Sequence, residues 1–163
     1  MIGMHNIRNA TAAISLAFTI GLPEKCIKAG IYNFKGVQRR FSHLFDYNNI
    51  SFYDDYAHHP TEISSVLSGV EKVYKNKEIV CVFQPHRISR VISLKKEFSK
   101  CFKKADTVLL CPIYAANEKL RLNFTYHSFA KLIIKNSNVR LIQVEDELQL
   151  QKFIKQNVFG EKI

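Results

Sequence analysis

Strand-like and helix-like segments alternate through most of this chain, and that alternation limits its fold more than any other feature. Short apolar runs typical of strands occupy residues 50–53, 78–83, 106–111 and 139–144, and amphipathic segments typical of helices follow them at residues 61–73, 90–104, 125–134 and 147–158. Strands separated by helices run parallel and connect through right-handed crossovers. The sequence therefore predicts an α/β fold: a Rossmann-like, mostly parallel sheet flanked by helices, with its strands at 78–83 and 106–111 buried on both faces.

Two further helices are expected ahead of this region, over residues 4–21 and 24–33, and Gly21 is expected to end the first of them. Such a helical pair buries too little apolar surface to form a domain alone. We therefore expect residues 1–36 to be the end of something that is missing upstream. Residues 37–163 are expected to form the α/β domain, with its last strand missing.

The formal charge of +10 at pH 7 raises the question of a nucleic-acid partner. The lysines, however, are scattered, mostly over the exposed faces of the expected helices, and no RNA-binding fingerprint with interleaved aromatic residues occurs. A solvated lysine-rich surface explains the charge, and an anionic small substrate fits it almost as well. We expect no nucleic-acid partner.

The four cysteines, Cys26, Cys81, Cys101 and Cys111, form no C-x-x-C pair and lie within or beside apolar runs. They predict a reduced, cytoplasmic protein with neither a zinc site nor a disulfide framework, and Cys81 and Cys111 are expected inside buried strands. No run of residues has the length of a transmembrane helix, and the N-terminus lacks the layout of a signal peptide. We expect a soluble protein without a membrane partner.

Residues 53–62, Tyr-Asp-Asp-Tyr-Ala-His-His-Pro-Thr-Glu, lie where the second strand of a β-hairpin expected over residues 41–53 leads into a helix. Asp55 could bind ribose hydroxyls or orient a cation, or it could cap the helix, a role for which Thr61 competes. His58 and the adjacent histidine lack partners at zinc-ligand spacing. Binding of a carboxylate or phosphate, or proton transfer, suits them better.

A second polar loop follows the strand expected at residues 78–83. It carries His86, Arg87 and Arg90, and the two arginines are three residues apart at a helix start, where the helix dipole disfavours cations. Cations in that position indicate an anionic ligand; the alternative is a pair of ordinary surface arginines. Loops that follow consecutive parallel strands meet at one edge of a sheet, so we expect this loop and residues 53–62 to face one crevice.

Three residues ahead of the α/β region are further candidates. Asn6 and Asn9 lie on one helix face and could hydrogen-bond a nucleotide base or phosphate, although Asn6 alone could be an N-cap. Arg40, which follows Arg39, could clamp a phosphate at a domain junction or be an ordinary solvated cation. No glycine-rich phosphate loop occurs in the chain, so we do not expect it to hydrolyse ATP alone.

Four motifs, in this order, resemble those of the Mur ligases: GMHNIRNATAA at residues 3–13, GVQRRF at 36–41, DDYAHHPTEI at 54–63 and FQPHR at 83–87. The resemblance covers nearly the whole chain but only the later part of the family's sequence. The family's UDP-sugar-binding domain and most of its central ATPase domain have no counterpart here, and the resemblance implies that residues 1–36 are the C-terminal end of that central domain. Within the family, the motifs are most similar to those of the members that join L-alanine to UDP-N-acetylmuramate.

The resemblance implies an ATP- and Mg²⁺-dependent ligase of peptidoglycan biosynthesis. Such an enzyme converts the muramoyl carboxylate into an acyl phosphate, which the amino group of L-alanine then attacks. By motif, the residues expected to contact the nucleotide are Asn6, Asn9, Arg40, Asp55 and Tyr56, and those expected to meet the amino acid and the reacting carboxylate are His58, Arg87 and Arg90. The family's catalytic lysine and magnesium ligands have no positions in this chain, so no metal-binding residue is assigned.

The resemblance also implies a partner, the missing N-terminal and central ligase domains, either in the same polypeptide or as a separate chain. A relative that joins a tripeptide to UDP-N-acetylmuramate is an alternative, but Phe41 and Tyr56 favour L-alanine, because leucine and phenylalanine are expected there in that relative. A non-catalytic remnant that binds only a ligand or partner is another alternative. Asn117 departs from the glycine usual in the family's loop and is expected to alter the backbone there.

Overall fold

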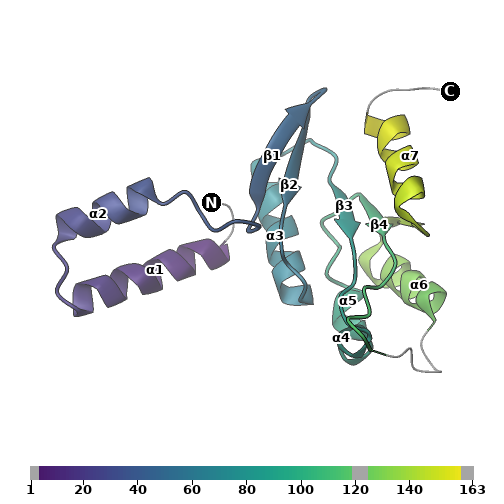
Figure 1. Ribbon diagram of the computed structural model, residues 1–163, viewed down its shortest axis with the longest axis horizontal. Helices are drawn as coiled ribbons and strands as arrows, with labels where there is room; N and C mark the ends of the chain where they lie inside the picture. The colour runs from purple at the N-terminus through teal and green to yellow at the C-terminus, as the bar shows by residue number, and fades with distance from the viewer. Residues whose placement is uncertain (1–3, 119–124, 159–163) are drawn as a thin grey trace.

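The predicted parallel sheet is present in the computed structural model, which describes residues 4–118 and 125–158 (Figure 1). It has three strands in the order β3-β4-β5, with bounds Val80–Phe83, Thr107–Leu110 and Arg140–Gln143. Both strand pairs are parallel, in a register that places Val80 beside Thr107 and Thr107 beside Arg140. The expectation of an α/β fold with a parallel sheet flanked by helices is confirmed.

Each strand is followed by a helix, as the alternation predicts. The helices that lie close to their predicted positions are α3 (Pro60–Val73), α6 (Tyr126–Ser137) and α7 (Glu147–Val158). The helix α6 starts at an N-cap, Thr125, whose side chain accepts a hydrogen bond from the backbone N–H of Ser128 at 3.3 Å. It ends at Asn138, which adopts the left-handed conformation that stops a helix (φ 52°).

The prediction of a single helix over residues 90–104 is wrong. The segment instead forms two short helices, α4 (Ile88–Ser93) and α5 (Lys95–Phe98), and continues as turns. The backbone leaves helical geometry at Leu94, between the two helices, with a φ of −109° and a ψ of 24°. Just after α5, the carbonyl oxygen of the buried Ser99 accepts a hydrogen bond from Ser137 Oγ at 2.8 Å, which joins this segment to α6.

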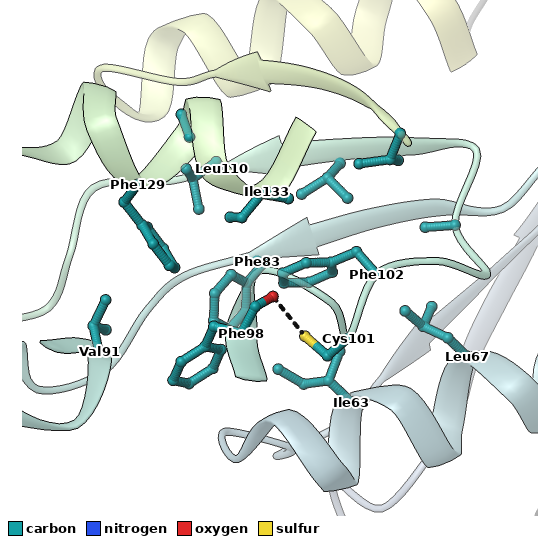
Figure 2. Packing of buried hydrophobic residues seen from close by; sticks show 14 residues of the cluster. Ile63, Leu67, Phe83, Val91, Phe98, Cys101, Phe102, Leu110, Phe129 and Ile133 are labelled. Atoms are coloured by element: carbon teal, nitrogen blue, oxygen red, sulfur yellow. Dashed lines mark hydrogen bonds between the residues drawn. The ribbon is translucent and has the colours of Figure 1, made fainter. Parts of the chain in front are cut away.

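The main hydrophobic core lies between the sheet and the helices, and Figure 2 shows its packing. Three fully buried phenylalanines, Phe98, Phe102 and Phe129, come from segments on both sides of β4 in the sequence. The ring of Phe83, at the end of β3, lies 5.1 Å from that of Phe102 and 5.7 Å from that of Phe98. Burial of each such side chain contributes about 1.5–3 kcal/mol, so this cluster holds the helices on the sheet.

The predicted hairpin is present but forms a separate sheet. Its strands β1 (Ser42–Tyr47) and β2 (Ile50–Asp54) pair antiparallel around Asn48 and Asn49, whose positive φ angles of 47° and 64° suit a tight hairpin turn. Because β2 does not pair with β3, β3 is an edge strand, and Val82 is 51% exposed. The expectation that residues 78–83 are buried on both faces is therefore wrong, and Cys81 is only half-buried.

The first two helices form a pair that projects from the rest of the molecule (Figure 1). They are α1 (Met4–Thr19) and α2 (Glu24–Asn33), close to the predicted bounds. Gly21 ends α1 with a φ of 81°, and the backbone N–H of Leu22 bonds the carbonyl of Ala17 in the Schellman pattern. None of the described helices is long and apolar enough to cross a lipid bilayer.

Candidate functional site

Asp55 joins the end of β2 to the residues that lead into β1. One carboxylate oxygen accepts a hydrogen bond from the backbone N–H of Phe41 at 2.7 Å, and the other accepts one from Ala57 at 2.6 Å. Neither Asp55 nor Thr61 caps the following helix, because the N-cap of α3 is His59, which accepts from the backbone N–H of Thr61. The alternative in which Asp55 or Thr61 caps this helix is therefore wrong.

The segment leading into β1 is held in a strained conformation beside Tyr56. Arg39 and Phe41 both have positive φ angles, 57° and 50°, which cost non-glycine residues about 1–3 kcal/mol each. The Arg39 guanidinium lies 4.9 Å from the centroid of the Tyr56 ring and donates to Asp54 at 3.0 Å, and the Tyr56 N–H donates to the Arg39 carbonyl at 2.7 Å. These contacts bring two predicted nucleotide contacts, Tyr56 and the neighbouring Arg40, into one neighbourhood.

Glu62 connects Arg40 and His58, although it was not among the sequence candidates. One of its oxygens accepts a hydrogen bond from Arg40 Nη1 at 3.4 Å, and the other accepts from the backbone N–H groups of His58 and His59 at 3.1 and 3.2 Å. Burial favours the neutral acid, but the two backbone donors, the charge of His58 and the hydrogen bond from Arg40 outweigh it and lower the pKa of Glu62. The signal that could have found it is its position three residues after an N-cap, which defines a capping box.

His58 also contacts Tyr56, so the stretch between β2 and α3 holds a compact polar group. The His58 ring nitrogen Nδ1 lies 3.0 Å from the carbonyl oxygen of Tyr56, and the two rings meet edge to face at 5.3 Å. We name Arg40, Asp55, Tyr56 and His58 the hairpin group. Arginine, carboxylate, aromatic ring and imidazole together could bind phosphate, sugar hydroxyls and a base.

Asn6 and Asn9 both lie inside α1, which contacts α3. Asn6 is half-buried and Asn9 is exposed. Because Asn6 has helical neighbours on both sides, the N-cap alternative for it is wrong. The prediction that the pair meets a nucleotide stays a prediction.

Arg87 and Arg90 lie at the second predicted loop, after β3, and we name them the arginine pair. Arg87 directly precedes α4, with a φ of 66°. Arg90 lies in that short helix, and its Nη1 atom is buried without a hydrogen-bond partner in the part of the chain that the structure describes. Leaving such a donor unsatisfied costs about 1–3 kcal/mol, so an anionic oxygen at this atom would be stabilising.

The loop after β4 packs against this arginine loop. The backbones of His86 and Tyr114 form a parallel bridge, and their rings stack with centroids 5.3 Å apart. Ser89 donates to Glu118 from both its backbone N–H and its hydroxyl. Asn117 has a φ of 67°, so this asparagine takes the left-handed conformation that glycine would otherwise supply.

The hairpin group and the arginine pair are not joined within residues 4–118 and 125–158: no hydrogen bond or ion pair connects them. A cavity of about 560 Å³ lies between β2, α3 and the edge of β3, and of these site residues it contacts only Asp55. A second cavity of about 530 Å³ lies beyond the carboxyl ends of β4 and β5 and contacts neither group. The expected single crevice that holds both loops is therefore not formed by the described part of this chain.

The cysteines do not contribute to this site. All four are free thiols, and burial raises the pKa of Cys101 and Cys111, which keeps both protonated at neutral pH. Among the described residues, no three histidine, cysteine, aspartate or glutamate side chains lie close enough to hold a metal ion.

The comparisons with known proteins point to one family. The family model described as the glutamate ligase domain of Mur ligases matches residues 39–155. The UDP-N-acetylmuramate–L-alanine ligase of Pelagibacter ubique is 62% identical over 163 residues, which is 100% of this chain and 35% of that protein. The chain thus spans about a third of the length of this curated relative.

Solved structures agree with the sequence match. The UDP-N-acetylmuramate-alanine ligase of Thermotoga maritima superposes with a TM-score of 0.71 at 31% identity, over 93% of this chain and 32% of that one. A murein peptide ligase of Psychrobacter arcticus superposes with a TM-score of 0.67 at 24% identity, over 97% of this chain and 32% of that one, which shows a shared fold.

Proposed function

This chain belongs to the Mur ligase family, and we propose that it supplies the C-terminal part of an enzyme that joins L-alanine to UDP-N-acetylmuramate. The observation that carries this proposal is the 62% identity to such an enzyme along all 163 residues. On this proposal, residues 1–36 complete a central nucleotide-binding domain, and residues 37–163 form the C-terminal ligase domain. We place the enzyme in the cytoplasm, in keeping with its free thiols.

The proposed reaction has two steps. The muramoyl carboxylate takes the γ-phosphoryl group of ATP and becomes an acyl phosphate, with release of ADP. The amino group of L-alanine attacks the acyl carbon, and the tetrahedral intermediate expels phosphate to leave an amide. Both steps bring anionic groups together, so cationic side chains that neutralise them lower the barrier.

The hairpin group is proposed to bind the nucleotide together with Asn6 and Asn9. The Arg40 side chain is 48% exposed, and its one ion pair with a described residue is the long contact to Glu62, so it is available to a phosphate. Asp55 uses one lone pair of each oxygen for backbone N–H groups and retains others that can accept from ribose hydroxyls. The exposed Tyr56 ring offers a surface beside the base.

The arginine pair is proposed to meet the amino acid and the reacting carboxylate, with His58 beside them in the assembled enzyme. The unsatisfied Nη1 of Arg90 supports this role, because a carboxylate or acyl phosphate oxygen would complete its hydrogen bonding. Because the two groups are not joined within the described chain, we propose that substrate and the remaining ligase domains bring them together.

Mg²⁺, which this ligase chemistry uses, does not fit a site made by the described residues of this chain, since none of their clusters offers three suitable ligands. We therefore derive no step through a metal ion here. Its ligands are proposed to belong to the remainder of the enzyme.

The α1–α2 pair is proposed to pack against that remainder. Among the described residues of the pair only Ile27 is buried, whereas large apolar side chains are exposed along the two helices and their connection: Met4, Ile7, Leu16, Phe18, Ile20, Leu22, Ile31 and Tyr32. Apolar surface of this extent marks a contact with another protein surface. The curated relative is about three times as long as this chain, and the additional length is proposed to supply the surface that covers the pair.

The test is phosphate release from ATP in the presence of UDP-N-acetylmuramate and L-alanine. We would fuse this chain in place of the matching third of the Pelagibacter ubique enzyme, and name the product the reconstituted ligase. Activity of the fusion, with none from this chain or the upstream portion alone, supports the proposal. A well-folded but inactive fusion would leave the non-catalytic remnant as the better explanation, and activity with a tripeptide in place of L-alanine would favour the tripeptide-joining relative.

A further inference from the structure

The backbone of Arg87 is held in a conformation that it would not adopt alone. Its φ of 66° and ψ of 123° lie where non-glycine residues are rare, and it directly precedes α4. Such a conformation persists only when the neighbouring structure determines it. The contacts on either side of Arg87 therefore set the direction in which its side chain leaves the backbone.

The contacts that precede Arg87 come from the start of the loop after β4. The backbone N–H of Arg87 donates to the Tyr114 carbonyl at 2.9 Å, and the Tyr114 N–H donates to the Pro85 carbonyl at 2.9 Å. The stacked rings of His86 and Tyr114 close this side. These bonds join two loops that follow neighbouring strands of the sheet.

The contacts that follow Arg87 come from one carboxylate further along the same loop. Glu118 Oε2 accepts from the Ser89 N–H at 2.8 Å, and Glu118 Oε1 accepts from the Ser89 hydroxyl at 2.7 Å. Ala116 and Asn117 have left-handed φ angles of 52° and 67°, and this turn directs Glu118 back toward Ser89. The two bonds from Ser89, aided by the charge of Arg87, lower the pKa of Glu118, so it is ionised at neutral pH.

We propose that Glu118 is a positioning residue for Arg87. Its carboxylate fixes Ser89, and the bonds to Tyr114 fix the residues ahead of Arg87, so the backbone from which the Arg87 side chain extends is held at the carboxyl edge of the sheet before substrate arrives. The identity of the anion that Arg87 then meets, the carboxylate of L-alanine, rests on the proposed function. If the Glu118 carboxylate only stabilised this loop, its loss would lower the free energy of unfolding and would change the kinetic constants of every substrate to the same extent.

The kinetic test uses the reconstituted ligase. Glu118→Ala is expected to raise the KM for L-alanine about tenfold while the KM for ATP changes less than about twofold, because only the amino-acid contact loses its alignment. Glu118→Gln, which keeps an amide oxygen as acceptor, is expected to restore part of the loss. In an Arg87→Ala background, Glu118→Ala is expected to have no further effect, because it acts through Arg87. Glu97→Ala, which removes an exposed glutamate of α5, is the matched control.

Equal effects on every substrate, or an undiminished effect of Glu118→Ala in the Arg87→Ala background, would overturn the proposal. A second measurement separates its failure from failure of the proposed function, because it uses this chain alone. In an NMR pH titration, the Ser89 amide proton is expected to follow a pKa below the ordinary 4.5 of glutamate, and Glu118→Gln is expected to abolish that response. If the reconstituted ligase is inactive, L-alanine is not the ligand of Arg87. If the Ser89 amide does not titrate, Glu118 does not position Arg87.

Discussion

At the scale of single residues, Asp55 shows how a side chain can be structural before it is functional. It accepts hydrogen bonds from Phe41, 14 residues before it, and from Ala57, and it does so next to two strained positions, Arg39 and Phe41. Charged acceptors make stronger hydrogen bonds than neutral ones, so one carboxylate can offset much of that strain. The Asp55 carboxylate is therefore already oriented before any ribose binds to it.

Asp55→Ala is expected to lower the free energy of unfolding by about 2 kcal/mol, because two backbone N–H groups lose a charged acceptor. The measurement is denaturant unfolding of the isolated chain. The matched control is Asp54→Ala, which removes only an exposed ion pair with Arg39 and is expected to cost less than about 1 kcal/mol. Equal losses in the two variants would contradict the structural role of Asp55.

Two adjacent isoleucines of α6 allow a direct test of the core. Ile133 is 0% exposed within the main cluster, whereas Ile134 is 45% exposed. Ile133→Val is expected to lower the free energy of unfolding by about 1 kcal/mol, and Ile134→Val by less than about 0.5 kcal/mol. Denaturant unfolding of both variants measures the difference, and the reverse order would show that α6 packs through its other face.

At the scale of elements, the first turn of α3 combines a structural cap with the candidate site. His59 and Glu62 form a reciprocal capping box, and Pro60 occupies the first helical position. The same Glu62 contacts Arg40, so the helix start and the segment before β1 share one carboxylate. The charge of Glu62 therefore affects both the first turn of α3 and the position of Arg40.

The dependence of the free energy of unfolding on pH is expected to reveal the contribution of the Glu62 carboxylate. Because the pKa of Glu62 in the folded chain lies below its ordinary 4.5, ionised Glu62 stabilises the fold above that pH. This stabilisation is lost as the pH falls through the folded pKa. Glu62→Gln keeps the capping bond but cannot titrate, so its free energy of unfolding should fall less steeply between about pH 5 and 3 than that of the unsubstituted chain. Parallel curves from the two proteins would show that the charge contributes nothing.

At the scale of the whole molecule, the distribution of apolar surface is uneven. The core around β4 is buried, whereas the α1–α2 pair exposes apolar side chains along its length. The chain therefore has one part that folds around its own core and another that leaves apolar surface exposed, as a contact surface does.

Phe18→Glu is expected to weaken association of this chain with the upstream portion of the Pelagibacter ubique enzyme by about tenfold or more, because it places a charge in an apolar contact. The free energy of unfolding of the isolated chain should hardly change, since Phe18 is exposed in α1. Calorimetric titration measures the affinity. Leu148→Glu alters an exposed leucine of α7, far from α1 in Figure 1, and is the matched control; an equal loss in both would argue against a contact through α1.

The sequence by itself determined the order and type of most elements. Local periodicity, the Asn48-Asn49 turn and Gly21 were enough for the hairpin, the helical pair and the strand–helix alternation, because each depends on neighbouring residues. The same local pattern, with the motif resemblance, selected Arg40, Asp55 and Arg87 as site candidates. Their chemical type is visible in the sequence, whereas their contacts are not.

Tertiary structure decided everything that depends on distant partners. Pairing left β3 at an edge, so its apolar run did not mean burial on both faces. Ser137 bonds the carbonyl of Ser99 across a sequence separation of 38 residues, just after α5 ends. Glu62 and Glu118 contact the site through bonds to residues 22 and 29 positions away. A capping box could have marked Glu62 as a helix-start residue, but its bond to Arg40 and that of Glu118 to Ser89 join distant residues and therefore leave no local pattern in the sequence.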